Sequence, residues 1–251
     1  MSVLAALLVA VGAADLSRSM LTRARVPPRR TALRAVVAGL TALVAVSALA
    51  GLFTPAGAGL VALAAVGTAA WVLVSEASFS SPRGHVPALL VLGASLALQL
   101  LLSGWAPTAG GPLGTWLGWA ELPWSADAER ALLLTGLALV QLATGNVVVR
   151  LVLLATGAMA AAPNLDRPSE ELKGGRLLGP LERLFILGLG LAGQVTAAGL
   201  VIAAKGLIRW PELSAYSREE ESHIDKVTEY FLVGSFVSWL VALAGLALAA
   251  A

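Results

Sequence analysis

The sequence predicts an all-α fold, a polytopic transmembrane bundle of about seven helices. Three observations predict it. Hydrophobic residues make up 58% of the 251 residues, charged residues make up only 13%, and cysteine is absent. Because a soluble domain is about 25% charged on average, this chain has too few charges to cover a water-exposed globule. The composition therefore argues against a soluble enzyme, a disordered chain and a secreted disulfide-bonded scaffold.

The charges are grouped between long charge-free stretches. A bilayer core about 30 Å thick needs roughly 20 apolar residues of helix. The stretch 35–75 is about twice that length, and Thr54-Pro55-Ala56-Gly57 favours a turn near its middle. We therefore expect a single integral membrane domain over 1–251, with spans at about 2–16, 35–53, 57–75, 86–104, 131–150, 182–204 and 230–249.

The first span, 2–16, is short and has no basic residue before it, unlike a cleaved signal peptide. We expect a spanning helix, and an interfacial or tilted helix is the alternative. The loop 15–34 follows and holds an arginine cluster at 18–34. Beside an apolar helix, such a cluster predicts contact with anionic lipid headgroups of the bilayer rather than with nucleic acid.

Two connections are long enough to have structure of their own. The segment 105–130 is rich in Gly and Pro and contains Trp105, Trp116, Trp119 and Trp124, which predicts an interfacial loop in the headgroup layer. The segment 206–229 is the most charged, and it predicts an extramembrane helix or loop. Ser217 and Glu220 have the spacing of a capping box that would begin this helix. A solvated face is the expected role of its charges, and a metal site that uses Glu219 and His223 is the alternative.

The distribution of basic residues predicts the orientation. If seven spans alternate strictly, twelve of the 17 Lys and Arg residues fall on the side of the loops 15–34, 76–85 and 151–181. Because short cytoplasmic loops carry the excess of Lys and Arg, these loops are expected inside. The N-terminus and the segment 206–229 would then lie outside, and the C-terminus would be cytoplasmic.

Polar residues within spans are the candidate site residues, because each one is costly in hydrocarbon unless it has a partner. Asn146 and Arg150 are four residues apart and share a helix face. Gln194 lies near the centre of 182–204, where its amide requires a partner on another helix. Structural glue is the expected role of Gln194, and a permeation site is the alternative.

Small residues in the last two predicted spans favour close helix packing. Gly193 and Gly199 lie in 182–204, and Gly234 and Ser238 lie in 230–249. Small side chains let helix backbones approach each other in a membrane. The two spans are therefore expected to pack together, either within one chain or across a homo-oligomer.

The C-terminal region resembles a known family. Residues 174–183 (GGRLLGPLER), 192–194 (AGQ), 202–209 (IAAKGLIR) and 229–238 (EYFLVGSFVS) are similar, in order and spacing, to a bacterial membrane family catalogued as domain of unknown function 3307. The resemblance covers about 170–245 and implies a bacterial inner-membrane protein, without supplying an activity. Five charged residues of this sequence match charged positions of the family, and the resemblance makes them candidates for an interhelical ion-pair set: Glu182, Arg183, Lys205, Arg209 and Glu229.

Within this set, Lys205 and Glu229 lie at the ends of charge-free stretches on the same predicted side, so they are expected to pair. Independent helix-end charges are the alternative reading.

Three classes of function remain. We expect a structural or accessory subunit of a membrane assembly, with another membrane protein or a second copy as its partner. A translocator or channel for a small solute or ion is the alternative, although no expected span holds a mid-membrane Asp or Glu, the usual carrier of coupling. An intramembrane enzyme ranks third, because the sequence has no nucleotide fingerprint, catalytic triad or metal-ligand pattern. No catalytic residue, metal or cofactor is expected.

Overall fold

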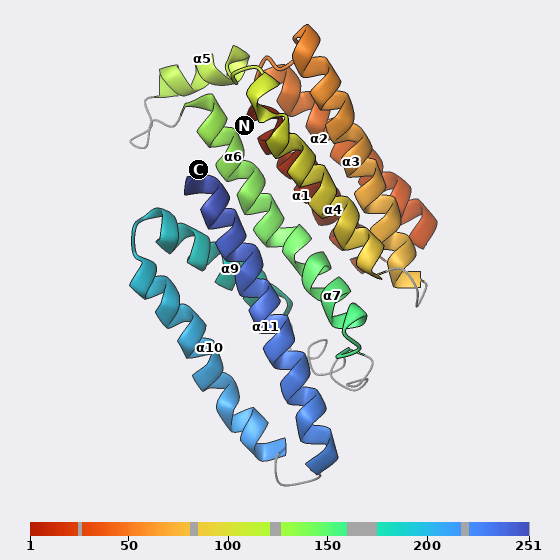
Figure 1. Ribbon diagram of the computed structural model, residues 1–251, viewed down its shortest axis with the longest axis vertical. Coiled ribbons are helices and arrows are strands. Elements are labelled where there is room, and N and C mark those ends of the chain that lie inside the picture. The colour runs from red at the N-terminus through yellow and green to blue at the C-terminus, as the bar shows by residue number, and fades with distance from the viewer. Residues whose placement is uncertain (25–26, 81–84, 121–126, 160–174, 217–220, 251) are drawn as a thin grey trace. The chain divides into compact units, whose positions relative to one another are not determined.

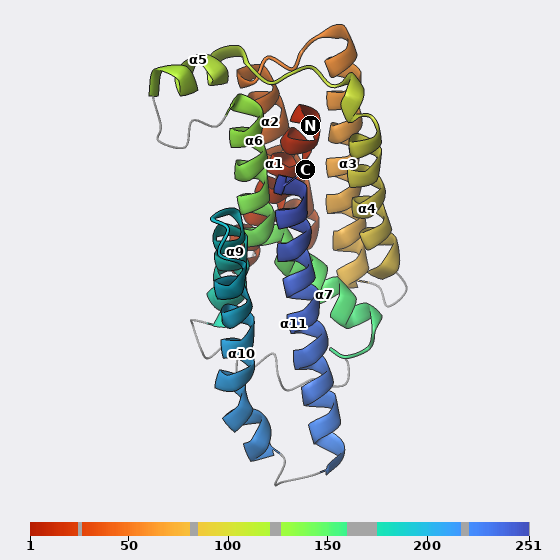
Figure 2. The same ribbon diagram turned by 60° about the vertical axis from the view of Figure 1, so that its left-hand side comes forward.

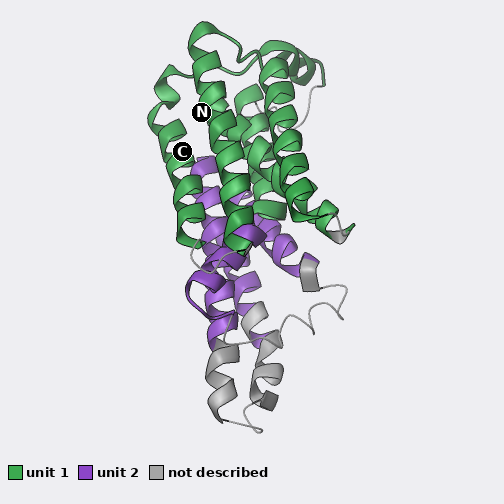
Figure 3. Cartoon of the chain, turned by 90° about the vertical axis from the view of Figure 1, so that its right-hand side faces the viewer, with its two compact units in different colours: residues 1–144 green, residues 145–251 purple. Residues whose placement is uncertain are grey.

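The computed structural model describes residues 1–251 except 25–26, 81–84, 121–126, 160–174, 217–220 and 251. All regular secondary structure in these described residues is helical. The chain divides into two compact units, Met1–Thr144 and Gly145–Ala251 (Figure 3). The all-α prediction is confirmed, and each unit is described by itself below.

The described residues of unit 1 form five long or medium helices, a short α5 and two short turns of helix (Figure 1). Its elements are α1 (Ser2–Arg23), α2 (Pro28–Leu49), α3 (Pro55–Ser80), α4 (His85–Leu101), the 3₁₀ turn η1 (Ser103–Trp105), α5 (Gly111–Ala120), α6 (Ala128–Leu139) and the π-helical turn η2 (Val140–Thr144).

Helix α1 lies at the centre of unit 1, in contact with α2, α3, α4 and α6 (Figures 1 and 2). Its first ten residues after Met1 are buried all round. Close approach depends on glycines of the neighbouring helices. A Cβ added at Gly136 of α6 would lie 2.8 Å from Leu8 Cβ, and one added at Gly39 of α2 would lie 2.9 Å from Ala14 Cβ. The first predicted span is therefore a full-length helix and the core of its unit.

Segments of unit 1 that are far apart in sequence meet at one end of the unit. Ser2 Oγ donates a hydrogen bond to the carbonyl of Pro107 over 2.5 Å, and the amide of Gly110 donates to the carbonyl of Ala50 over 2.9 Å. Gly111 has a φ of +54° and lies against residues 49–51. The start of α1, the end of α2 and the segment after α4 thus share this end, which we call the N-terminal end.

The described residues of unit 2 form α7 (Gly145–Ala155), α9 (Gly175–Leu191), α10 (Val195–Tyr216) and α11 (Glu221–Ala250). Helices α9 and α11 are parallel neighbours, since Arg183 contacts Ser238 and Gly190 lies against Leu246. Helix α7 packs antiparallel on α11 through Leu153, which lies against Gly234. A small core joins α9, α10 and α11; it consists of Ile186, Ala198 and Ala242 with Leu189, Ile202 and Trp239 around it.

The chain reverses direction between α9 and α10. Gly193 has a φ of +74°, its amide donates to the carbonyl of Gly190, and the amide of Gln194 donates to the carbonyl of Leu189. These are the two hydrogen bonds of a Schellman motif, which ends a helix and satisfies its last carbonyls. The predicted single span over 182–204 is therefore wrong, because a residue in the left-handed region stops the helix at its centre.

Five described helical segments are long and apolar enough to cross a membrane. They are Ser2–Thr22, Pro28–Leu49, Pro55–Phe79, Ala128–Ala155 and Glu229–Ala250. Two shorter apolar helices, His85–Leu101 and Val195–Ala204, accompany them. The Trp-rich segment 105–130 contains the helix α5 rather than a loop alone, and its described tryptophans are largely exposed. The charged segment 206–229 is helical up to Tyr216 and again from Glu221.

Candidate functional site: two buried polar clusters

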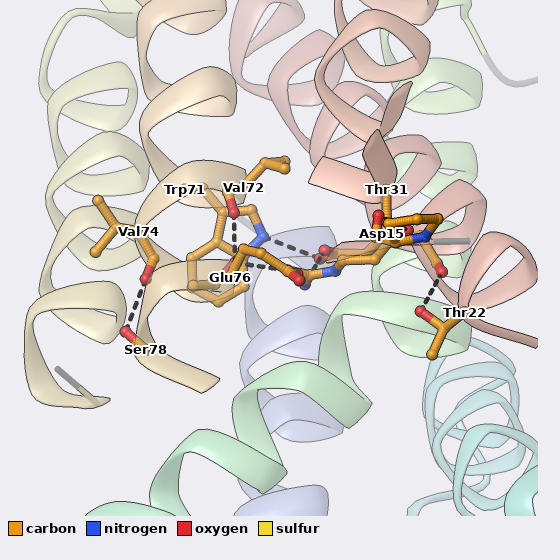
Figure 4. Close-up of polar contacts among 11 residues, drawn as sticks. Asp15, Thr22, Thr31, Trp71, Val72, Val74, Glu76 and Ser78 are labelled. Atoms are coloured by element: carbon orange, nitrogen blue, oxygen red, sulfur yellow. Dashed lines mark hydrogen bonds and ion pairs between the residues drawn. The ribbon is translucent and has the colours of Figure 1, made fainter. Parts of the chain in front are cut away.

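The first polar cluster joins α1 to α3 in unit 1, and we call it the Asp15 cluster (Figure 4). Asp15 and Arg18 are 2% and 6% exposed. Arg18 donates to Asp15 Oδ1 over 2.5 Å, and Trp71 Nε1 donates to Asp15 Oδ2 over 2.9 Å. The second guanidinium nitrogen of Arg18 donates to Ser75 Oγ over 2.8 Å. Both carboxylate oxygens of Asp15 therefore have a partner.

Arg18 has two further contacts on α3. Glu76 Oε2 lies 3.7 Å from its guanidinium, and the ring centroid of Phe79 lies 5.8 Å from it. Glu76 is closer to the surface than Asp15, because its side chain is 22% exposed against 0%. The guanidinium of Arg18 thus contacts a buried carboxylate, a peripheral carboxylate and an aromatic ring. The face of an aromatic ring attracts a cation.

This cluster was missed at the sequence level because Asp15 and Arg18 were expected in a loop. Instead both lie in α1, one helical turn apart. Arg18 therefore cannot belong to a headgroup-facing arginine cluster, whereas Arg29, Arg30 and Arg34 are exposed. No expected span held a mid-membrane Asp or Glu, but Asp15 lies within the membrane-compatible Ser2–Thr22 segment, three residues from its centre. A buried ion pair on one helix has a sequence signal, the i,i+3 spacing of opposite charges.

The π-helical turn η2 packs against α1 in the same unit. It carries Gln141 and Thr144, both buried to 1% exposure or less. π-Helical turns of this kind are rare and occur frequently at functional sites. The sequence does not predict this feature, because no residue type is specific for a π turn.

The second polar cluster joins three helices of unit 2, and we call it the Arg183 cluster. Arg183 of α9 is 1% exposed. It donates to Asn146 Oδ1 of α7 over 2.6 Å and to Ser238 Oγ of α11 over 3.0 Å. Gly145 allows the guanidinium to lie directly on the backbone of α7, since an added Cβ there would be 2.7 Å from Arg183 Nε.

Glu182 extends this cluster along α9. It is 6% exposed and accepts a hydrogen bond from Trp239 Nε1 of α11 over 2.8 Å. Ser238 and Trp239 lie near the middle of the Glu229–Ala250 segment, so Glu182 and Arg183 lie at the same depth. Buried charges at that depth are expensive unless hydrogen-bonded, and here each one bonds a neighbouring helix.

The structure thus brings together four of the predicted site residues: Asn146, Glu182, Arg183 and Ser238. Gln194 is exposed and lies in the turn between helices. Its backbone N–H and its backbone carbonyl both form hydrogen bonds there. It is not a buried interhelical residue of the described chain, because the helix ends before it.

The predicted packing glycines have different roles. An added Cβ at Gly193 or Gly199 would meet nothing within 4 Å, so neither glycine packs against another described helix of this chain. Gly234 does lie in a helix contact, but its neighbour is Leu153 of α7 rather than α10. The glycine that brings α9 against α11 is Gly190, whose added Cβ would lie 2.5 Å from Leu246.

The remaining predicted charges do not form one described set. Arg150 and Glu229 are exposed on α7 and α11. Lys205 and Arg209 lie on α10, but their side chains are outside the described residues, so their pairing stays a prediction. The same is true of the capping box at Ser217 and of the alternative metal site in 217–226. Within the described part of the chain, no group of three His, Cys, Asp or Glu residues could hold a metal ion.

The fold and the two clusters define a class of protein: an all-helical chain with several helices compatible with a membrane, whose buried charged side chains form hydrogen bonds to neighbouring helices. Comparison with known proteins gives no match to a family model, a curated protein or a solved structure.

Proposed function

We propose that the chain is a structural or accessory subunit of a membrane assembly. The observation that carries this proposal is a set of helix glycines that no described residue of the chain covers. An added Cβ would meet nothing within 4 Å at Gly59, Gly93, Gly188 or Gly199, on α3, α4, α9 and α10. Glycine costs about 1 kcal/mol relative to alanine in a helix interior, and in membranes it is typical of faces on which another helix packs.

The polar clusters support the same proposal. Asp15 is occupied by Arg18 and Trp71, and Arg183 is occupied by Asn146 and Ser238. The bonds from Trp71 to Asp15 and from Arg183 to Asn146 and Ser238 connect helices, and a buried charge with its partners in place has no spare coordination for a passing solute. Such clusters hold a scaffold together. With the resemblance to the bacterial family, we place this scaffold in a bacterial inner membrane, its N-terminus outside and its exposed arginines on the cytoplasmic leaflet.

A site-specific cross-linking experiment tests the proposal. A photoreactive amino acid at Leu200, beside Gly199 and 66% exposed, should capture a discrete protein in native membranes. The matched control is Val44 of α2, which is 56% exposed and has no uncovered glycine beside it. Cross-links at Leu200 and only lipid adducts at Val44 are expected. Lipid adducts at both positions would count against a partner.

A translocator is the second candidate, and one observation favours it. Asp15 is an acidic residue within a membrane-compatible helix, close to the π turn η2. The purified chain in liposomes that contain a pH-sensitive dye distinguishes the two candidates. A proton flux that Asp15→Asn abolishes would favour translocation, whereas a structural role predicts the same low flux for both proteins.

A further inference from the structure

The reversal between α9 and α10 changes the path of the chain across the membrane. We infer that residues 175–216 cross the membrane twice, out along α9 and back along α10, rather than once. The end of α10 and the start of α11 then lie on the side of the exposed arginines of α2. The C-terminus consequently lies on the same side as the N-terminus.

The depth of the turn follows from how α9 lies along α11. The two helices are parallel, with Arg183 beside Ser238 and Gly190 beside Leu246. The membrane-compatible part of α11 ends at Ala250. The turn at 192–194 therefore lies near the end of that segment rather than at its middle. This position also suits the exposed amide of Gln194, because irregular lipid-exposed backbone does not occur inside the hydrocarbon core.

Helix α10 returns along the same neighbours. Ala198 shares the small core with Ala242, Ile202 packs against the same core, and α10 runs antiparallel to α11 (Figures 1 and 2). Its apolar part, Val195–Ala204, is followed along the helix by two basic residues. With a rise of about 1.5 Å per residue, the 22 residues of α10 cover about 33 Å. This length is enough to bring its end back to the side on which α9 began.

Unit 1 supplies the rest of the path. Helices α1 to α4 alternate in direction, and the hydrogen bonds of Ser2 to Pro107 and of Gly110 to Ala50 bring the chain back to the N-terminal end after α4. The continuous helical segment Ala128–Ala155 then crosses to the other side. With α9, α10 and α11 added, the number of crossings is even, so both termini lie on one side.

The distribution of Lys and Arg residues also supports two crossings, and it is independent of the backbone geometry at 192–194. A single crossing over 182–204 would leave five basic residues on the N-terminal side: Arg130, Lys205, Arg209, Arg218 and Lys226. Two crossings carry Arg218 and Lys226 to the opposite side and Arg209 toward it, whereas Lys205, about 15 Å along α10 from the turn, lies near mid-depth. Every other Lys and Arg outside the helix bundle then lies on one face, as the bias of cytoplasmic loops toward Lys and Arg requires.

Single-cysteine labelling tests this inference cleanly, because the chain has no native cysteine. A membrane-impermeant maleimide is added to intact cells and, separately, to lysed cells. Thr115→Cys on α5 is the reference for the N-terminal side, and Thr22→Cys at the end of α1 is the reference for the other side; both positions are exposed. Ala250→Cys should behave like Thr115→Cys, and Ser217→Cys should behave like Thr22→Cys.

The opposite pattern, with Ser217→Cys grouped with Thr115→Cys and Ala250→Cys grouped with Thr22→Cys, would show a single crossing and overturn the inference. Each variant is first checked by gel filtration against the unmodified protein, so that a misfolded variant is replaced by a cysteine at a neighbouring exposed residue. A second readout is a spin label at Gln194, whose accessibility to a water-soluble relaxation agent should match that of an interface position. Accessibility to dissolved oxygen alone would place the turn in mid-membrane and contradict a double crossing.

Discussion

At the residue scale, the Asp15 cluster places two charged side chains in the protein interior, where each depends on its partners. Asp15 and Arg18 are both buried, and the partners that complete the cluster, Trp71 and Ser75, come from a helix more than fifty residues away. The i,i+3 spacing of the two charges is readable in the sequence. The burial is not, because it depends on which helices surround α1.

We predict that removal of either charge is strongly destabilising and that the pair is coupled. Asp15→Asn and Arg18→Met should each lower the free energy of unfolding by about 3 kcal/mol, because each leaves a buried charge without its partner. The double variant should cost less than the sum of the two. Unfolding in mixed micelles measures this, with exposed Arg34→Gln as the control. Additive losses would show that the two residues act independently.

A second prediction concerns the backbone under Arg183. Gly145→Ala should destabilise the protein, because the added Cβ would displace a guanidinium that is hydrogen-bonded to both Asn146 and Ser238. Gly179→Ala is the matched control, since its Cβ would make an ordinary contact 3.7 Å from the same side chain. Alanine gains up to about 1 kcal/mol in helix propensity at both sites, so the control should be neutral or stabilised. An equal change in thermal midpoint for both would contradict this view of the cluster.

At the scale of the element, α1 and the segment 182–204 show what the sequence can and cannot predict. Hydrophobicity located most of the helices, because the apolar length of a helix is a local property. The helix predicted from hydrophobicity is shorter than α1, since the charges of Asp15 and Arg18 resemble a span boundary until their partners are known. Hydrophobicity also joined α9 to α10, because the glycine that ends a helix and the glycines within it are the same residue type. Only the φ of Gly193 separates them.

The helix reversal gives a third prediction. Gly193→Ala should destabilise by about 1–2 kcal/mol, the cost of placing a Cβ in the left-handed region. Gly199→Ala should be neutral or should stabilise by up to about 1 kcal/mol, because the site is helical and open. Thermal unfolding of the two variants in one detergent compares them directly. If Gly199→Ala were the more damaging substitution, Gly193 would not have the conformational role assigned here.

At the scale of the whole molecule, the arrangement of charge is the property that no single helix shows. The exposed Arg29 and Arg30 lie in the first turn of α2 and the exposed Arg34 in its second turn, at the end of unit 1 opposite its N-terminal end. Arginine is unfavourable in the first turn of a helix, because it faces the positive end of the helix dipole. Its presence there is explained if anionic headgroups compensate the charge.

The fourth prediction therefore concerns lipid composition. In nanodiscs with anionic lipid, the protein should be more stable than in zwitterionic lipid, by about 1 kcal/mol for each arginine near the surface. Replacing Arg29, Arg30 and Arg34 together by Gln should remove most of this difference, whereas Arg130→Gln should leave it unchanged. In zwitterionic lipid the triple variant should be no less stable than the unmodified protein. A lipid effect that survives the triple substitution would have to arise elsewhere in the chain.

The central position of α1 has a consequence for how the protein is made. Helix α1 leaves the ribosome before α3 and α6, so it enters the membrane when Trp71 and its other neighbours have not yet been synthesised. Because Asp15 and Arg18 are one turn apart on the same helix, they can neutralise each other as soon as that helix forms. The pair thus lowers the free-energy cost of holding α1 in lipid until the later helices are inserted and enclose it.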